Sequence, residues 1–355
     1  MAKRSFYVKD SELDDFQVKV INKRTDCSYI VKGCAGSGKS ILALWKAKQI
    51  QEQNKGSYLY VVYTKALRRY MSDGIKQVGL RESNVANYDA CFSWSRDDNG
   101  KLERGSWKKG VFDYIIVDEA QDFSREDIEL LKSKARKALL VYGDTAQQLY
   151  KFLKNKQTVS MEEIQRFTGF PDEQLVFNHR LPKKIARVAQ YLNSERDDLE
   201  ERCTEEGTEK PKILEYPDIE SQFSAIVSII KNKGMEDVGI LFRSNDEVDE
   251  AYDYFTNAGL EVEAKSFNHN DELDFTSDNP KLMTYHSSKG LQFENVFVPE
   301  CTAEGDGDRN PLYVAITRTY RSLYIMHSGN LSSFFDDVPT DLYDQSLSSG
   351  PTLKL

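Results

Sequence analysis

The segment Gly33–Ser40, with the sequence GCAGSGKS, constrains the fold of this chain more than any other segment. It matches the pattern G-x-x-x-x-G-K-[ST], in which backbone N–H groups surround the phosphates of a nucleotide. A short apolar run, Tyr29–Val31, precedes it, and a helix-compatible run, Ile41–Gln53, follows it. In a strand–loop–helix unit of this kind, the N-terminus of the helix favours bound anions. The segment therefore predicts an α/β fold that holds a nucleoside triphosphate.

Each residue of this loop is a candidate nucleotide contact. The pattern assigns Lys39 to the β- and γ-phosphates and the Ser40 hydroxyl to Mg²⁺. The glycines allow the backbone to turn its N–H groups toward phosphate oxygens. The complete set of expected contacts is Gly33, Cys34, Ala35, Gly36, Ser37, Gly38, Lys39 and Ser40.

A second group of candidate residues follows the apolar, β-prone run Phe112–Val117. This run reads as a buried strand and ends in the acidic sequence DEAQD at Asp118–Asp122. Ligands of open α/β sheets bind at the carboxyl ends of the strands, where these side chains would lie. We expect Asp118 to contact Mg²⁺, through water, and Glu119 to orient the attacking water. Hydrolysis of a nucleoside triphosphate with Mg²⁺ is the predicted chemistry.

Further motifs point to one family. The strand-like run Ala138–Tyr142 ends in GDTAQQLY at Gly143–Tyr150, and this sequence together with DEAQD resembles superfamily 1 helicases of the UvrD/Rep type. The C-terminal half contains three more segments that resemble motifs of that family: NHR at Asn178–Arg180, TYHSSKGLQF at Thr284–Phe293 and LYVAITR at Leu312–Arg318. All occur in the family's order, so the resemblance covers most of the chain.

The resemblance implies two tandem RecA-like P-loop domains with mostly parallel sheets and with ATP in the cleft between them. We expect the first domain at residues 1–174, the second at 175–340 and a flexible tail at 341–355. Glycine and proline within Thr168–Asp172 mark the boundary. Alternation of strands and helices supports a parallel sheet in the second domain. Its expected strands are Lys212–Tyr216, Gly239–Phe242, Lys281–Tyr285, Val296–Val298 and Leu323–Met326.

The resemblance also implies roles for residues outside the loop. Gln147 would sense the γ-phosphate, and Arg180 and Arg318 would act as arginine fingers. Gln17 resembles the glutamine that reads the adenine edge. Two positions depart from the family pattern, because His179 replaces a tyrosine that stacks on adenine and Gln292 replaces a glutamate that contacts ribose.

Candidate nucleic-acid contacts come from the same resemblance. Aromatic side chains that stack on bases, with phosphate contacts beside them, are typical of single-strand binding. For Tyr63 and Phe152, simple packing is an equally good interpretation. The expected contacts are Tyr63, Thr64, Phe152, Thr284 and His286.

The net charge of −9 argues against a protein that binds nucleic acid over its whole surface. It leaves room for local basic clusters, each of which reads equally well as a solvated helix face: Lys65/Arg68/Arg69, Lys132/Lys134/Arg136/Lys137 and Lys183/Lys184/Arg187. The acidic segments Asn193–Glu209 and Asn270–Asp278 read as solvated loops. The five scattered cysteines suggest neither zinc nor an iron–sulfur cluster. We expect a cytoplasmic protein with no membrane partner, because long apolar segments are absent from the sequence.

The spacing of the motifs leaves little room for the large subdomains that full-size family members insert. About 45 residues separate Ala66 from Phe112, and about 100 separate Arg180 from Thr284. Ser95–Gly110 has the composition of a small hairpin about Asn99–Gly100. Such a hairpin would suit a pin that separates strands, but the sequence favours a plain surface loop.

The sequence therefore predicts an ATP-dependent, Mg²⁺-requiring translocase or helicase that moves on single-stranded DNA, with 3′-to-5′ polarity implied by the resemblance. Two alternatives remain at this stage. One is a regulatory P-loop ATPase subunit that switches a partner protein without unwinding, and the other is a helicase that acts on RNA. A protein partner that supplies duplex grip or regulation is compatible with each of them.

Overall fold

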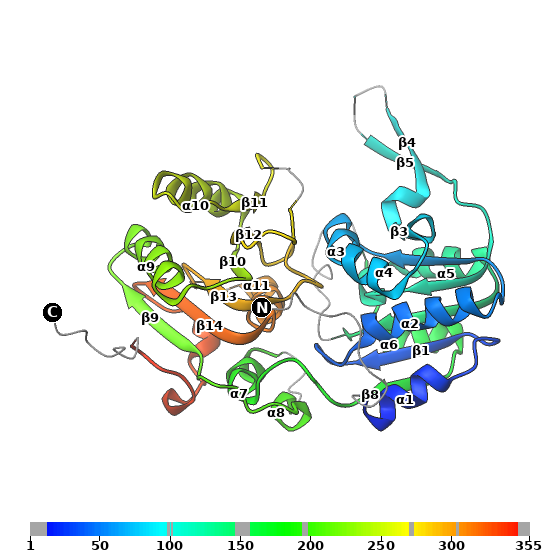
Figure 1. Cartoon of the computed structure of the whole chain (residues 1–355), viewed down its shortest axis with the longest axis horizontal. Helices are drawn as coiled ribbons and strands as arrows, with labels where there is room; N and C mark the ends of the chain where they lie inside the picture. The colour runs from blue at the N-terminus through cyan, green and yellow to red at the C-terminus, as the bar shows by residue number, and fades with distance from the viewer. Residues whose placement is uncertain are drawn as a thin grey trace. The chain divides into compact units, whose positions relative to one another are not determined.

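The computed structural model describes residues 13–97, 100, 102–145, 157–193, 198–269, 273–302 and 305–346. The chain forms two compact units that divide between Asn178 and His179. Each unit is built on one six-stranded sheet with helices packed against it (Figure 1). This arrangement confirms the predicted α/β class with two largely parallel sheets.

The sheet of unit 1 has the strand order β3-β2-β6-β7-β1-β8, and all its strand pairs are parallel. The strands are β1 (Tyr29–Gly33), β2 (Tyr58–Val62), β3 (Val85–Asn87), β6 (Phe112–Val117), β7 (Ala135–Gly143) and β8 (Asp172–Leu175). The central strands read as continuous apolar runs because both faces of a parallel sheet are covered. Their carboxyl ends therefore lie along one edge, where the loop after β1 and the acidic turn after β6 meet.

Helices cover both faces of this sheet (Figure 1). They are α1 (Asp15–Asn22), α2 (Lys39–Glu52), α3 (Lys65–Tyr70), α4 (Ser72–Val78), α5 (Arg125–Lys134) and α6 (Met161–Thr168), with the short helices η2 (Glu82–Asn84), η3 (Tyr88–Cys91) and η4 (Ala120–Asp122). One apolar cluster includes Leu42 of α2 and Leu67 of α3, and a second on the opposite face includes Ile128 of α5 and Ile164 of α6. Capping boxes start α1, α5 and α6.

Unit 2 contains the second sheet, with the order β11-β12-β10-β13-β14-β9 and parallel pairing throughout. Its strands are β9 (Lys212–Tyr216), β10 (Val238–Phe242), β11 (Glu263–Lys265), β12 (Lys281–Thr284), β13 (Phe293–Val298) and β14 (Thr319–Ser328). All five strands expected in this half are present. Only β11, a short strand at the edge of the sheet, was not anticipated.

The helices of unit 2 are α7 (Lys183–Leu192), α8 (Leu199–Arg202), α9 (Ile219–Lys233), α10 (Asn245–Asn257), α11 (Asp306–Ile316), η6 (Ser333–Phe335) and η7 (Thr340–Leu342). Helices α9 and α10 bury Phe223 and Phe255 in one apolar cluster with the sheet. Asp344 lies beside β9, where Ile213 N donates to its carbonyl at 2.9 Å. Residues 341–346 are thus attached to unit 2, which departs from the expected flexible tail; residues 347–355 lie outside the described part.

The segment Ser95–Gly110 is not the plain surface loop that the sequence favoured. Strands β4 (Phe92–Arg96) and β5 (Leu102–Trp107) pair as an antiparallel hairpin. In Figure 1 this hairpin projects from unit 1. Gly100 adopts a φ of 78°, which suits a tight turn; Asn99 lies outside the described residues.

The acidic segment Asn193–Glu209 was expected to be a solvated loop, and this prediction is wrong for its described part. The segment contains α8, whose Leu199 is buried. Arg187 of α7 forms ion pairs with Glu200 at 2.7 Å and Glu206 at 2.9 Å. These two ion pairs neutralise Arg187, one member of the basic cluster Lys183/Lys184/Arg187, so Arg187 is not free to bind an external phosphate.

The described helices are all too short or too polar to cross a lipid bilayer.

Candidate nucleotide-binding site

The loop between β1 and α2 has the tight geometry that its glycines predict. Gly36 and Gly38 have φ angles of 78° and 85°, in the left-handed region that favours glycine. A Cβ atom on Gly33 would lie 2.5 Å from the Ser37 hydroxyl and 2.9 Å from Leu175 Cβ. The loop therefore has no room for a side chain at this position, and the backbone turns closely around the start of α2.

Lys39 is held inside this loop. Its ammonium group donates to the carbonyl oxygens of Gly33 and Cys34, each at 2.8 Å, and the residue is only 6% exposed. The Ser37 hydroxyl is buried and has no hydrogen-bond partner among the residues that the structure describes. A cation beside an unsatisfied hydroxyl in a glycine-rich loop fits the phosphates of a nucleotide, because the phosphate oxygens accept from both.

Asp118, directly after β6, is completely buried next to the loop. Its Oδ2 accepts from the Tyr60 hydroxyl at 3.0 Å, and its Oδ1 accepts from Glu119 N at 3.0 Å. Burial raises the pKa of Asp118, and the nearby Glu119 raises it further. The Ser40 hydroxyl, the hydrogen bond from Tyr60 and the charge of Lys39 act in the opposite direction.

The two residues predicted to hold Mg²⁺ lie near each other, although 78 positions separate them in the sequence. The Ser40 hydroxyl lowers the pKa of the Asp118 carboxyl. A hydroxyl and a carboxylate are oxygen donors of the kind that Mg²⁺ binds, and Mg²⁺ usually retains several waters besides. The donor set fits this ion.

Glu119 has an unusual backbone conformation, with φ 54° in the left-handed region. Its Oε2 accepts from the side-chain amide of Gln121 at 2.5 Å. The other end of that amide, Gln121 Oε1, accepts from Asp144 N at 2.9 Å. Gln121 is fully buried, and its two hydrogen bonds connect the turn after β6 to the end of β7.

Gly143 makes room for this connection, because a Cβ atom there would lie 2.6 Å from Gln121 Oε1. The sequence analysis missed two residues of this site. Gln121 is the fourth residue of DEAQD, whereas Tyr60 belongs to none of the motifs. The Gln121 position inside a motif was the one signal that could have identified it.

Gln17 reaches the loop from α1. Its amide nitrogen donates to Ser37 O at 3.1 Å, and its amide oxygen accepts from Asp14 N at 3.1 Å in the capping box of the helix. Each end of an amide can form a second hydrogen bond. This placement is compatible with the predicted adenine contact. Gln147 and Phe152 fall in residues 146–156 and lie outside the described residues.

The candidate arginines of unit 2 meet at Thr317. Arg180 donates through Nη2 to Thr317 O at 3.0 Å, and Arg318 donates through Nη2 to Thr317 Oγ1 at 3.2 Å. Arg318 also donates to Val314 O at 2.8 Å and is only 1% exposed. For Arg318 to contact a phosphate, some of these internal hydrogen bonds must be exchanged. The arginine-finger assignments stay predictions.

The remaining predicted contacts of unit 2 are His179 and Gln292 for the nucleotide, and Thr284 and His286 for nucleic acid. His179 is exposed, as stacking on a base requires, and Gln292 is half-buried directly before β13. Thr284 ends β12, where its hydroxyl accepts from Ser287 N at 3.2 Å. His286 follows and is half-buried; burial lowers its pKa, while the charge of Asp308 raises it.

Tyr63 and Thr64 have local structural roles. The Tyr63 ring packs edge-on against Phe123, with 5.3 Å between ring centroids, and is half-buried. Thr64 caps α3, because its hydroxyl accepts from Leu67 N at 3.1 Å. Packing and capping account for both residues, and contact with nucleic acid stays a prediction for them.

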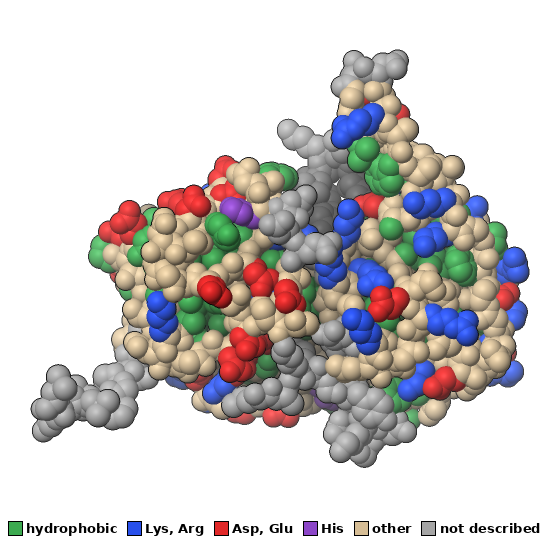
Figure 2. All heavy atoms as spheres, turned by 45° about the horizontal axis from the view of Figure 1, so that its top comes forward, with side chains coloured by type: hydrophobic (Ala, Val, Ile, Leu, Met, Phe, Trp, Pro, Cys, Tyr) green, Lys and Arg blue, Asp and Glu red, His purple; other side chains and the backbone are tan. Residues whose placement is uncertain are grey.

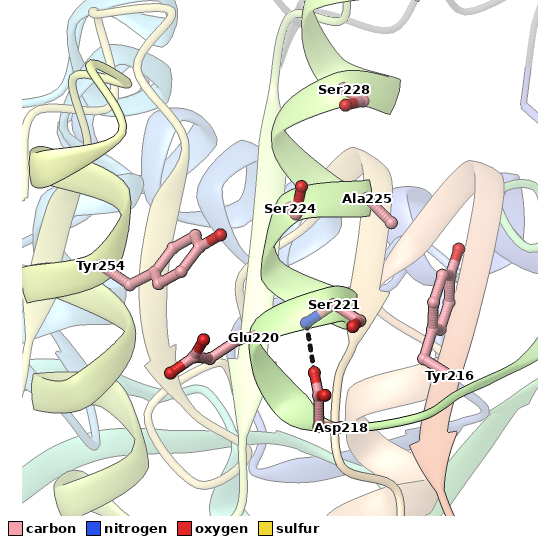
Figure 3. A pocket seen from close by; sticks show the side chains of 8 residues that line it. All are labelled: Tyr216, Asp218, Glu220, Ser221, Ser224, Ala225, Ser228 and Tyr254. Carbon is pink, nitrogen blue, oxygen red and sulfur yellow. Dashed lines mark hydrogen bonds between the residues drawn. The ribbon is translucent and has the colours of Figure 1, made fainter.

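An open pocket of about 530 Å³ lies in unit 2, apart from all these residues (Figure 3). It is lined by side chains of α9, by Tyr216 and by Tyr254, which points toward α9 from α10. Asp218 caps α9 by accepting from Ser221 N at 2.7 Å. With Asp218 and Glu220 in its wall, the pocket repels phosphate groups and does not suit a nucleotide.

Comparisons with known proteins agree with the motifs. A family model described as UvrD-like helicase C-terminal domain matches residues 281–326, and one described as AAA domain matches residues 17–153. No curated protein sequence matches the chain.

Among solved structures, the C-terminal domain of a possible DNA helicase from the Lactobacillus strain WCFS1 is 17% identical, with a TM-score of 0.39, and covers 47% of this chain and 98% of its own. The Arterivirus nonstructural protein 10 helicase is 18% identical, with a TM-score of 0.44 over 88% of this chain. The PRRSV helicase is 17% identical, with a TM-score of 0.46 over 88% of this chain. This chain spans 61% and 54% of the two viral chains, respectively.

The two family models cover the phosphate loop, the DEAQD turn and the TYHSSKGLQF and LYVAITR segments in the family's order. The two models and the motifs identify residues 17–153 and 281–326 as similar to those of UvrD/Rep-like superfamily 1 helicases.

Proposed function

We propose that this protein is an ATP-dependent, Mg²⁺-requiring motor that moves on single-stranded DNA in the 3′-to-5′ direction. The observation that carries the proposal is the convergence of Lys39, Ser40 and Asp118 at the carboxyl ends of β1 and β6. These are the groups that phosphoryl transfer to water requires for positioning and charge neutralisation. Similarity of the matched segments to UvrD-like helicases supports the coupling of this hydrolysis to movement on a strand.

The residues of unit 1 divide the chemistry among them. Lys39 would exchange its bonds to the Gly33 and Cys34 carbonyls for phosphate oxygens. Ser40 and Asp118 would hold Mg²⁺, which supplies charge neutralisation at the phosphates when it is bound. Glu119 would accept a hydrogen bond from the attacking water and orient it. The bond from Gln121 would keep the Glu119 carboxylate in one orientation.

The distribution of charge supports a nucleic-acid track despite the acidic total. Unit 1 contains 30 Lys and Arg against 24 Asp and Glu, whereas unit 2 contains 18 against 33. On the face shown in Figure 2, Lys and Arg side chains are numerous on unit 1 and acidic side chains are numerous on unit 2. Because affinity for nucleic acid depends on neutralising phosphates, we assign the main electrostatic contact to unit 1.

The hairpin of β4 and β5 is a candidate contact with a DNA duplex. Trp94 is 42% exposed and Leu102 is 54% exposed, and the register places Trp94 opposite Arg104 and Arg96 opposite Leu102. These alternate positions share one face, which is thus aromatic, apolar and cationic. Such a face suits stacking against a base pair.

The base of this hairpin is anchored to unit 1. The Arg104 guanidinium lies 4.6 Å from the Phe92 ring centroid and forms an ion pair with buried Asp127 at 3.2 Å. Phe92 and Trp107 pack edge-on, with 5.5 Å between their ring centroids. A hairpin held in this way can transmit force to a duplex, so we propose that it provides the weak strand separation expected of a chain without large inserted subdomains.

Stopped-flow translocation on oligonucleotides of increasing length tests this function. A label at the 5′ end should report arrival times that grow linearly with length for DNA, and a label at the 3′ end should not. If arrival times grow with length on RNA but not on DNA, the protein moves on RNA. ATP hydrolysis that is indifferent to both would favour the regulatory ATPase that switches a partner protein.

A further inference from the structure

Tyr60 lies beneath the candidate nucleotide site and belongs to none of the sequence motifs. It is in β2, next to β6, and is completely buried. In the register of the two strands Tyr60 stands opposite Ile116, and Asp118, directly after β6, is two residues beyond Ile116. The Tyr60 hydroxyl reaches this residue and donates to Asp118 Oδ2 at 3.0 Å.

The Asp118 carboxylate is held at both oxygens by separate parts of the fold. Tyr60 of β2 occupies Oδ2, while the backbone N–H of Glu119 occupies Oδ1 at 3.0 Å. A buried carboxylate is stable only when it is hydrogen-bonded, and bonds to a charged acceptor are stronger than those between neutral groups. Two such bonds from fixed donors leave the carboxylate little freedom to rotate.

We propose that Tyr60 is a positioning residue for Mg²⁺–nucleotide binding, and that its hydroxyl fixes the orientation in which Asp118 presents its remaining lone pairs to the metal site beside Ser40. The inference rests on the proposed function of Ser40 and Asp118 as the Mg²⁺ site. It predicts that the hydroxyl of Tyr60, rather than its ring, affects how the protein uses Mg²⁺.

The core of unit 1 supplies a matched control. Tyr29 of β1 is fully buried in the same apolar cluster as Tyr60. Its hydroxyl lies 3.4 Å from the hydroxyl of Tyr142. Tyr29→Phe therefore removes a buried hydroxyl from the same core without removing a donor to Asp118.

The test compares Tyr60→Phe, Tyr29→Phe and the wild type in the binding of a fluorescent non-hydrolysable ATP analogue. Affinity is measured at a series of Mg²⁺ concentrations and in EDTA, and thermal unfolding is recorded for each protein. Loss of one hydrogen bond to a charged group predicts about a tenfold weaker affinity in Mg²⁺ for Tyr60→Phe. In EDTA, the affinity of Tyr60→Phe should stay within about twofold of the wild type. The affinity of Tyr29→Phe should stay within about twofold of the wild type both in Mg²⁺ and in EDTA.

A double-mutant cycle with Asp118→Asn completes the test. If Tyr60 acts through Asp118, Tyr60→Phe should change Mg²⁺-dependent binding by less than twofold in the Asp118→Asn background. Equal losses in EDTA and in Mg²⁺, or wild-type behaviour of Tyr60→Phe, would overturn the inference. Failure of the wild type to bind the analogue at all would instead overturn the proposed function.

Discussion

The amide nitrogen of Gln121 lies 2.5 Å from the carboxylate oxygen Oε2 of Glu119. Only Ala120 separates the candidate water-orienting base from the side chain that holds it. Because Gln121 also accepts from Asp144 N after β7, the position of Glu119 depends on two neighbouring strands.

We predict that Gln121→Ala lowers kcat for ATP hydrolysis by about tenfold or more, because a hydrogen bond to a charged carboxylate contributes roughly 1.5–3 kcal/mol. Equilibrium binding of ATP should change by less than about threefold, since the side-chain hydrogen bonds of Gln121 go to Glu119 and to Asp144 N. Gln51→Ala is a suitable control, because Gln51 Nε2 bonds to Gly79 O on another part of unit 1. A Gln121→Ala protein with wild-type kcat would show that Glu119 needs no such support.

Glu119→Gln should retain ATP binding and hydrolyse ATP about 100-fold more slowly or worse, because general-base catalysis commonly contributes 10²–10⁴-fold. Binding and single-turnover hydrolysis are measured on the same preparation. Near-normal turnover would remove the assignment of Glu119 as the base.

Lys39→Ala should both weaken nucleotide binding and abolish turnover. The substitution removes the cation that now lies 2.8 Å from the carbonyls of Gly33 and Cys34. Lys48→Ala on the same helix is the control, since the Lys48 ammonium group lies 3.8 Å from Glu52 and 6.0 Å from the Trp45 ring centroid, and not in the phosphate loop. Full ATPase activity in Lys39→Ala would contradict the nucleotide site itself.

We predict that the protein discriminates only weakly between ribose and deoxyribose nucleotides. Gln292, in place of a charged ribose contact, is half-buried, and exposed His179 offers less stacking area than a tyrosine. We expect kcat/KM for dATP to lie within about threefold of that for ATP. Gln17→Ala should reduce the preference for ATP over GTP. Strong discrimination against dATP would show that another residue reads the sugar.

The hairpin makes a separate prediction. Trp94→Ala should reduce strand displacement of a short duplex and leave DNA-stimulated ATP hydrolysis within about twofold of the wild type. Stacking on a base contributes roughly 1–3 kcal/mol, so the loss should be at least severalfold. Val111→Ala, which alters an exposed apolar side chain outside the two strands, is the control. Equal unwinding by Trp94→Ala and the wild type would exclude the hairpin from strand separation.

The sequence predicted those parts of the structure whose signal is local. The glycines of Gly33–Ser40 allow the left-handed backbone angles that the loop requires. Continuous apolar runs such as Phe112–Val117 form strands because both faces of a parallel sheet are buried. The second sheet followed from the same signal, with Lys212–Tyr216 confirmed as β9.

Contacts between distant segments could not be predicted. The Tyr60–Asp118 bond depends on the register of β2 against β6, and the pairing of Arg187 with the acidic segment depends on how α7 and α8 pack. The sequence favoured a surface loop over the hairpin of β4 and β5 for a similar reason. The hairpin is stabilised by packing of Phe92, Trp107 and Arg104 at its base, which the local sequence does not reveal.

Steady-state ATP hydrolysis, measured with and without single-stranded DNA, tests the central claim most directly. The wild type should hydrolyse ATP only with Mg²⁺, and single-stranded DNA should raise the rate at least severalfold. The stimulated rate should fall with increasing salt, as phosphate contacts require. Glu119→Gln should remove both the basal and the stimulated rate. A basal rate that neither DNA nor RNA changes would contradict the account of this protein as a nucleic-acid motor.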